Sequence, residues 1–207
     1  MKYNICVFIL AATVVSLMGW IVENIWLALT KGYIDNRSMT LPFLLGYGLF
    51  IVALYLVIGT PQSLSLLMKG TDRTSQQRCI LVYFLISMVL VSIGEVILGT
   101  LVERVCGFSY WNYEQIPLHI TKYTSLPTSS GFALGITIFM EKFFLPLLDL
   151  LAKLPFRLSC ILALVFGISL TADFWVSFVK MYRHRSLNYR WRLEVRKPRF
   201  SYRFRSN

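Results

Sequence analysis

Long apolar runs without a single charge are the feature that most constrains this chain. Residues 5–22 contain no charged side chain, and neither do residues 38–68. A helix needs roughly 20 mostly apolar residues to cross a bilayer, because lipid offers no partner to an unpaired backbone N–H or C=O group. Hydrophobic residues make up 56% of the chain and charged ones only 15%, below the usual value of about 25%. We therefore expect an all-α protein, a polytopic transmembrane helical bundle.

Five stretches are candidate membrane segments. Four are apolar over most of their length, whereas the stretch at about 129–151 contains Glu141, Lys142, Pro146 and Asp149. Charges facing lipid are costly, so this stretch is expected to be a kinked span, a re-entrant hairpin or an interfacial helix. The predicted transmembrane domain covers residues 1–180, with segments at about 5–30, 42–67, 79–106, 129–151 and 158–179.

Residues 181–207 form a basic, aromatic tail. Ten of the 21 Lys and Arg residues lie between Lys180 and Arg205, where Glu194 is the only acid. Positive charge next to a span is retained in the cytoplasm, so we expect this tail in the cytoplasm. The amino terminus is then outside with five spans and inside with four, and the remaining basic residues do not decide between these cases. The first apolar run lacks a small-residue cleavage site, which favours a retained helix over a signal peptide.

The cysteines, histidines and known catalytic motifs give no sign of a metal or cofactor. The four cysteines are isolated, fall in or at the ends of apolar segments and form no C-x-x-C pair, and there are only two histidines. No G-x-x-x-x-G-K-[ST], G-x-S-x-G or H-E-x-x-H sequence occurs. We predict no metal and no cofactor, and any transport would be driven by a gradient or by a separate ATPase.

Acids inside the predicted spans are the first candidates for chemistry, because the bilayer makes each one costly. Glu23 lies four residues after Gly19, and Glu95 lies four before Gly99, so each acid shares a helix face with a glycine. Glycine lets another helix approach closely, and the carboxylate can then meet a partner. The functional interpretation is a polar cleft for a cation, a proton or a polar headgroup. The alternative is that the acids pair with nearby arginines such as Arg37, or with each other, and fix helix register.

Two loops add further candidates. Asn36 and Arg37 lie in the first loop between helices, where a guanidinium could hold a phosphate or carboxylate through forked hydrogen bonds. The alternative is an ordinary turn whose arginine anchors the headgroup layer. The third loop carries Trp111, Asn112 and Tyr113 in an aromatic stretch. Taken alone, such a stretch is more typical of an aromatic belt at the membrane interface than of a binding site.

Basic and aromatic residues are interleaved along the tail. This pattern suits a surface of anionic lipid headgroups, where each basic residue adds about 1 kcal/mol. The same composition can bind nucleic acid through base stacking, but directly after a membrane span lipid is favoured over nucleic acid. The predicted lipid-contacting residues are Arg190, Trp191, Arg192, Arg203 and Arg205.

Several short motifs follow one another in a set order. A Gly-Trp-x-x-Glu precedes an Asn-Arg, a Pro followed by a Tyr-Gly, a Glu with a Gly four residues on, and a Trp-x-Tyr with a Pro four residues after the Tyr. Over about residues 16–150 this order resembles a family of small bacterial integral membrane proteins, Putative ABC-transporter type IV. The residues that carry the resemblance are Gly19, Trp20, Glu23, Asn36, Arg37, Pro42, Tyr47, Gly48, Glu95, Gly99, Trp111, Asn112, Tyr113 and Pro117.

The resemblance implies a permease-like subunit of a bacterial inner (cytoplasmic) membrane that works with a separate ATPase. It also implies an oligomer, since a chain of 207 residues would need to dimerise to enclose a pathway. The sequence departs from the family pattern at several positions. Asn112 replaces the family Asp, Ser38-Met39 replaces Gly-Phe, and Leu41 replaces the Gly before Pro42. The first departure matters most, because a catalytic or ion-binding carboxylate at this position would be lost here.

The leading hypothesis is a permease-like transport subunit with a polar intramembrane site. Arg37 would contact an anionic group there. Two alternatives stay open: a membrane-embedded enzyme acting on a lipid or lipid-linked substrate, and a non-catalytic membrane partner or regulator. No catalytic residue is predicted, because no recognisable nucleophile–base pair is present. The candidate site residues are Trp20, Glu23, Asn36, Arg37, Tyr47, Glu95, Trp111, Asn112 and Tyr113.

Overall fold

The structure is a computed structural model that describes residues 2–67 and 73–195. Helices dominate it, and the strands are short pieces in two separate antiparallel pairs, β1–β4 and β2–β3. The helices are α1 (Ile5–Thr30), α2 (Leu45–Val57), α3 (Pro61–Leu67), α4 (Arg73–Cys106), α5 (Leu126–Lys142), α6 (Phe144–Ala152) and α7 (Phe156–His184). The strands are β1 (Tyr33–Asp35), β2 (His119–Thr121), β3 (Thr124–Ser125) and β4 (Arg192–Glu194).

Four helices among the described residues are long and apolar enough to cross a membrane, and the fold class expected from the sequence is confirmed. They are Ile5–Thr30, Leu45–Ser65, Thr74–Cys106 and Phe156–His184. The pair α5 and α6 counts as a fifth span if it is taken as one element, bent by 47°. This bend lies in the predicted segment 129–151, where a kinked span was one of three options. The division at residues 180 and 181 into membrane domain and tail stays a prediction.

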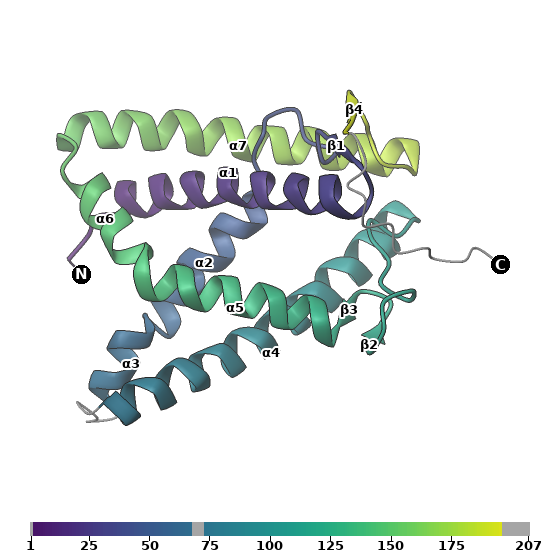
Figure 1. Cartoon of the computed structure of the whole chain (residues 1–207). Coiled ribbons are helices and arrows are strands. Elements are labelled where there is room, and N and C mark those ends of the chain that lie inside the picture. Colours follow the sequence, from purple (N-terminus) through teal and green to yellow (C-terminus); the bar gives the residue numbers. More distant parts are fainter. Residues whose placement is uncertain (1, 68–72, 196–207) are drawn as a thin grey trace.

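The bundle has two distinct ends (Figure 1). The amino-terminal end holds the start of α1, the α6 helix and the start of α7. The tail end holds all four strands and the last turns of α4 and α7. Between the ends, α7 and α1 run side by side, α5 and α4 lie on the other side of the bundle, and α2 crosses between them.

The crossing of α2 over α1 depends on two glycines. A Cβ at Gly48 would lie 2.0 Å from the backbone oxygen of Ala12, and one at Gly19 would lie 2.4 Å from the ring of Tyr47. The backbone N–H of Leu44, just before α2, also donates to the carbonyl of Ser16 at 3.0 Å. Glycine allows this close approach because it has no Cβ.

The main hydrophobic core fills the amino-terminal half of the bundle. It combines the first half of α1 with the second halves of α2 and α5, the first half of α4, and α6. Its most completely buried large side chains are Tyr83, Met140, Phe144 and Leu148. A second, smaller cluster of Val102, Cys106 and Met181 joins the ends of α4 and α7 at the tail end.

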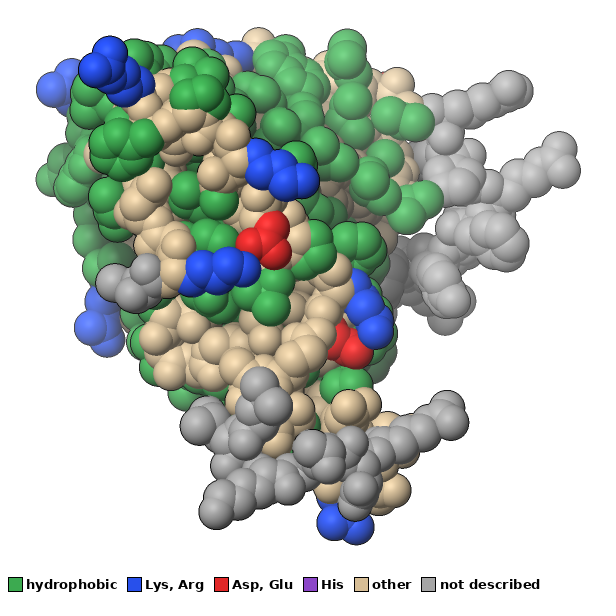
Figure 2. All heavy atoms as spheres, turned by 90° about the vertical axis from the view of Figure 1, so that its left-hand side faces the viewer, with side chains coloured by type: hydrophobic (Ala, Val, Ile, Leu, Met, Phe, Trp, Pro, Cys, Tyr) green, Lys and Arg blue, Asp and Glu red, His purple; other side chains and the backbone are tan. Residues whose placement is uncertain are grey.

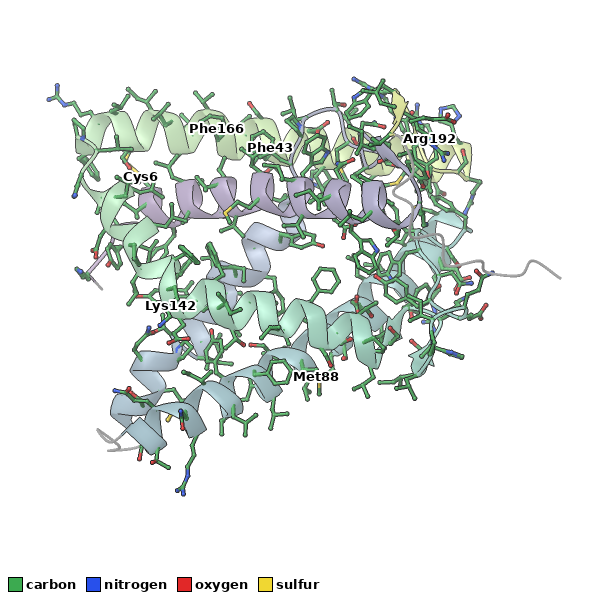
Figure 3. All side chains as sticks on the ribbon, in the orientation of Figure 1. Cys6, Phe43, Met88, Lys142, Phe166 and Arg192 are labelled. Atoms are coloured by element: carbon green, nitrogen blue, oxygen red, sulfur yellow. A yellow bond between two sulfur atoms is a disulfide. The ribbon has the colours of Figure 1, made fainter. Side chains whose placement is uncertain are left out.

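A disulfide between Cys6 and Cys160 ties the start of α1 to the start of α7 (Figure 3). The two cysteines are 154 residues apart in the sequence. Their isolated positions had suggested no role, and the pairing becomes visible only when α1 and α7 lie side by side.

The beginning of the tail folds back onto the first loop. Tyr33 pairs with Glu194 and Asp35 with Arg192 in the β1–β4 register. On the same loop, the backbone N–H groups of Thr40 and Leu41 donate to the carboxylate of Asp173, which lies inside α7. These contacts fix the first loop over the end of the bundle and account for the acid within the last span.

Candidate polar site at the tail end

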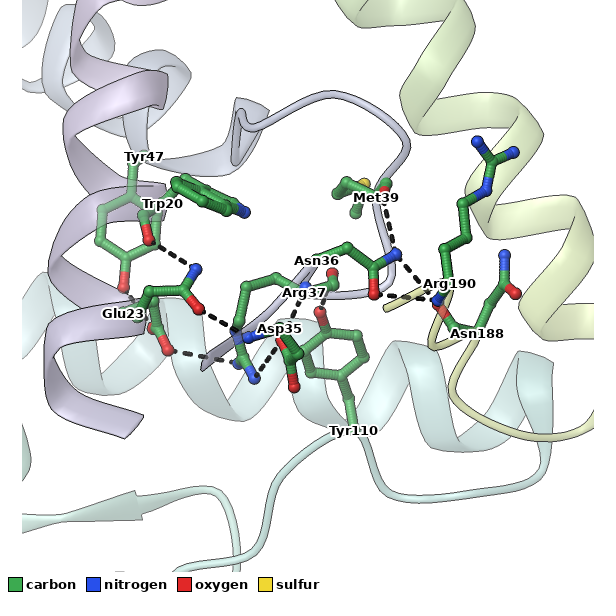
Figure 4. Close-up of polar contacts among 11 residues, drawn as sticks. Trp20, Glu23, Asp35, Asn36, Arg37, Met39, Tyr47, Tyr110, Asn188 and Arg190 are labelled. Carbon is green, nitrogen blue, oxygen red and sulfur yellow. Dashed lines mark hydrogen bonds and ion pairs between the residues drawn. The ribbon is translucent and has the colours of Figure 1, made fainter. Parts of the chain in front are cut away.

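Glu23, Tyr47 and Arg37 meet in one cluster at the tail end of α1 (Figure 4). The Tyr47 hydroxyl donates to Glu23 Oε1 at 2.6 Å, and Arg37 Nη2 lies 3.2 Å from Glu23 Oε2. The side chains of Arg37 and Glu23 are 16% and 20% exposed, so the ion pair is mostly withdrawn from solvent. Three predicted site residues from α1, the first loop and α2 therefore lie in direct contact.

Asp35 completes this ion-pair cluster. Its fully buried carboxylate accepts a hydrogen bond from the backbone N–H of Arg37 at 2.7 Å and lies 4.0 Å from Arg37 Nη1. The backbone N–H of Asp35 donates to the side chain of Asn24 in α1. Arg37 and Ser38 adopt left-handed backbone conformations with φ of 49° and 60°. Such conformations cost about 1–3 kcal/mol each, so they persist only where surrounding contacts fix the loop.

Tyr110 covers Arg37 from the third loop. Its hydroxyl donates to the Arg37 carbonyl at 2.7 Å, and the guanidinium lies 5.7 Å from its ring centroid. Burial raises the pKa of Tyr110 to about 12, so the hydroxyl stays a donor at neutral pH. Burial alone would lower the pKa of Arg37, but Tyr110, Glu23 and Asp35 together raise it above its ordinary value. The charge of Arg37 is thus balanced inside the protein.

Glu95 lies on α4 and contacts hydroxyl groups. Its Oε2 accepts hydrogen bonds from Thr124 Oγ1 at 2.8 Å and Ser129 Oγ at 3.2 Å. Burial raises the pKa of Tyr113, and the charges of Glu95 and then Glu23 raise it further. Tyr113 is thus a protonated phenol that feels both acids, one on α4 and one on α1. Among the described residues, no Lys or Arg forms an ion pair with Glu95.

Glu103, two turns further along α4, is paired differently. It accepts hydrogen bonds from Ser109, Lys122 and Tyr123, and the contact with Lys122 is an ion pair. The hydrogen bond with Glu103 raises the pKa of Lys122, which keeps the amine charged. A Cβ on Gly99 would lie 2.4 Å from the Tyr123 ring, so the glycine makes room for this partner. Glu103 therefore anchors the third loop to the last part of α4.

The other predicted site residues contact neither Glu23 nor Glu95 through a described hydrogen bond or ion pair. Asn36 has a structural role, because its amide bonds the backbone of Met39, Asn188 and Arg190 (Figure 4). Trp111 donates its indole N–H to the carbonyl of Tyr123. Asn112 is exposed and forms hydrogen bonds with Glu114, so it does not contact Glu23 or Glu95. Trp20 lies 6.2 Å from Trp191, centroid to centroid, and its indole N–H has no partner among the described residues.

Three of the tail residues predicted to contact lipid, Arg190, Trp191 and Arg192, are exposed and lie in the part of the tail that packs on the first loop. The Arg190 backbone bonds Asn36, and the Arg192 guanidinium lies 3.4 Å from the ring centroid of Tyr33. Lipid contact by Arg190, Trp191 and Arg192 stays a prediction, and Arg203 and Arg205 lie outside the described residues.

Four contributors to the site were missed from the sequence. Asp35 and Tyr110 complete the Arg37 cluster, and Thr124 and Ser129 hold Glu95. For Asp35 the sequence holds a weak local signal, because this acid lies two residues before Arg37 in the same loop. The roles of Tyr110, Thr124 and Ser129 depend on long-range packing. Within residues 2–67 and 73–195, no group of three or more His, Cys, Asp and Glu side chains could hold a metal ion.

A known family matches most of the chain. The family described as Putative ABC-transporter type IV matches residues 10–178. The chain belongs to this family. No curated protein and no solved structure matches it. Membership extends the predicted resemblance over α1 to α7 and, together with the apolar helices, makes this a multi-pass membrane protein related to transport.

Proposed function

We propose that this Putative ABC-transporter type IV member is a permease-like subunit whose tail-end polar site binds a cation or a proton. The observation that carries the proposal is Glu95. A carboxylate inside a span costs about 2.5–3.5 kcal/mol or more, and such residues are generally paired or functional. The described partners of Glu95 are hydroxyl groups, which orient a carboxylate without neutralising it.

The sign of the ligand follows from the charges around the site. Arg37 faces two acids, Glu23 and Asp35, and Glu95 adds a third. The acids thus exceed the bases in this group, which favours a positive ligand. The anionic ligand expected at Arg37 from the sequence is not supported by these contacts, because the guanidinium already has internal partners.

Aromatic side chains suit the same ligand class. The Tyr47 hydroxyl donates to Glu23, and Tyr113 feels the charges of both Glu23 and Glu95. Trp111 contacts the ring of Tyr110, which covers Arg37. Aromatic faces attract organic cations through their quadrupole, by about 0.5–2 kcal/mol per ring. A protonated amine would therefore find carboxylates and ring faces together.

Flux measurements in proteoliposomes test this proposal. Purified protein would be reconstituted with a pH-sensitive dye inside, and the decay of an imposed pH gradient would be followed with and without a panel of organic amines. We expect movement by the wild-type chain, loss in Glu95→Gln, and retention in the matched control Glu114→Gln, an exposed loop acid. Equal flux in Glu95→Gln and wild type would contradict the assigned role of Glu95.

The partner is tested separately. We propose a separate ATPase subunit and a homo-oligomer, in an inner membrane whose anionic headgroups meet the tail. Affinity purification from gently solubilised native membranes, followed by mass spectrometry of proteins and lipids, should recover an ATPase in stoichiometric amount. A chain that is recovered alone and moves none of the tested cations, with or without candidate ATPases, would count against the permease assignment.

A further inference from the structure

We infer that the end of the bundle that holds the polar site faces the cytoplasm, so that its ligand enters from that side. The orientation follows from three features that do not depend on any transport activity. Only the step from orientation to ligand entry rests on the proposed function.

The first feature is the Cys6–Cys160 disulfide at the amino-terminal end. Disulfides persist in oxidising surroundings such as the bacterial periplasm or the cell surface, and are rare where thiols are kept reduced. Both cysteines lie within the first two turns of their helices, at the same end of the bundle. This end therefore faces away from the cytoplasm.

The second feature is the charge at the opposite end. The tail carries nine of the 21 Lys and Arg residues, and Lys180 directly precedes it. Its first part is bound to the first loop through β1 and β4, and the Val195 N–H donates to the Gly32 carbonyl at 2.9 Å. The tail and the first loop, with Lys31 and Arg37, thus share one side. Positive charge next to spans is retained in the cytoplasm, which places this side inside.

The third feature is the number of crossings. The end of α4 lies at the tail end, because the Arg185 guanidinium donates to the Val105 carbonyl at 3.0 Å. The start of α7 lies at the other end, because Cys160 bonds Cys6. The chain between them must pass along the bundle, and α5 with α6 makes this passage. With five crossings the two termini lie on opposite sides of the membrane. The disulfide places the amino terminus outside and the basic tail places the carboxyl terminus inside, so the two arguments give the same orientation.

The distribution of polar and apolar residues then sets the access. Glu23, Glu95 and Tyr113 belong to the tail half, whereas the main core of Tyr83, Phe144 and their neighbours fills the other half. Figure 2 shows the amino-terminal end face, on which Lys or Arg side chains (blue) lie beside acidic ones (red). Two ion pairs belong to this end, Lys2 with Asp149 and Lys142 with Glu141. The main apolar core thus separates this face from the polar site, so the ligand is expected from the tail end.

Thiol labelling tests the orientation. Single cysteines would be introduced at exposed positions on each side: Gln62→Cys and Lys153→Cys at the amino-terminal end, and Glu114→Cys and Ser186→Cys at the tail end. A membrane-impermeant maleimide is added to spheroplasts, and then to permeabilised samples, with the parent chain as background. We expect the first two to react from outside and the last two only after permeabilisation.

Each other outcome overturns the inference. Labelling of Ser186→Cys from outside would reverse the orientation, and equal labelling from outside of both sets would refute a single orientation. Mass spectrometry of unreduced protein should show the Cys6–Cys160 peptide pair, and free thiols there would remove the first argument. Because labelling needs no transport, a protein labelled as expected but inactive in liposomes would refute the proposed function alone.

Discussion

Replacing Arg37 by Leu should destabilise the protein more than any other single loop change, because Arg37 is the cation of a mostly buried cluster. Its guanidinium lies 3.2 Å from Glu23 and 4.0 Å from Asp35. At an effective dielectric constant of about 20, the pair at 3.2 Å attracts by about 5 kcal/mol, and desolvation cancels part of this gain. Removing one partner of a buried pair typically costs about 3–5 kcal/mol, since it leaves the other charge uncompensated.

The assay is thermal unfolding in detergent, followed by loss of the monodisperse peak in size-exclusion chromatography. For a chain of this size each kcal/mol shifts Tm by about 2–4 °C, so Arg37→Leu should lower Tm by roughly 6–20 °C. Lys31→Leu is the matched control, because Lys31 is exposed in the same loop and forms no ion pair among the described residues. Its effect should stay within about 0.5 kcal/mol.

A double-mutant cycle separates the ion pair from backbone effects of the loop. The double variant Arg37→Leu/Glu23→Gln should lose less unfolding free energy than the two single variants lose together, by about 0.5–3 kcal/mol. If Arg37→Leu shifts Tm no more than Lys31→Leu, or if the two changes are additive, Arg37 is not held by Glu23. The guanidinium would then be available for an external anion, against the charge argument for a positive ligand.

Three further predictions rest on separate parts of the structure. Gly48→Ala should cost about 1–3 kcal/mol because its Cβ would meet the Ala12 carbonyl, whereas Gly46→Ala, with open space around it, should be neutral or slightly stabilising in the same Tm assay. Because the folded-state pKa of Tyr110 is about 12, the stability that its protonated hydroxyl contributes is complete below pH 10 and is lost as the pH rises to 12. Tyr110→Phe should flatten this part of the curve of stability against pH. An unchanged curve would exclude Tyr110 as its cause. Cys160→Ser should lower stability by about 2–5 kcal/mol, and a reducing agent should lower Tm in the wild type but leave the variant unchanged.

The sequence was most informative where a local pattern controls the outcome. Charge-free apolar runs specify helices because the bilayer permits little else, and α1 begins and ends where the run at 5–30 was placed. The predicted segment 42–67 instead contains α2 and α3, separated by a break at Gly59, whose φ of 85° interrupts the helix. Glu23 and Glu95 could be selected because an acid in a span is costly wherever its partners lie.

What could not be predicted depends on pairs that are distant in the sequence. Tyr110 reaches the Arg37 carbonyl across 73 residues, and Cys6 meets Cys160 across 154. No periodicity or spacing encodes these contacts, since they arise only when separate helices pack. The same holds for Asn112, which lies in the aromatic motif but forms hydrogen bonds with Glu114 and not with Glu23 or Glu95.

The two acids of the family motifs thus have different physical situations, although the sequence presents them alike. Glu23 is bound by Tyr47 and Arg37, so its charge is compensated and its geometry is fixed. Glu95 is oriented by hydroxyl groups of Thr124 and Ser129, which leave its charge to be balanced by something else. A positive ligand or a proton at Glu95 would supply that balance, and the neutralised Glu23–Arg37 pair beside it would hold the surrounding loop in place while the ligand binds and leaves.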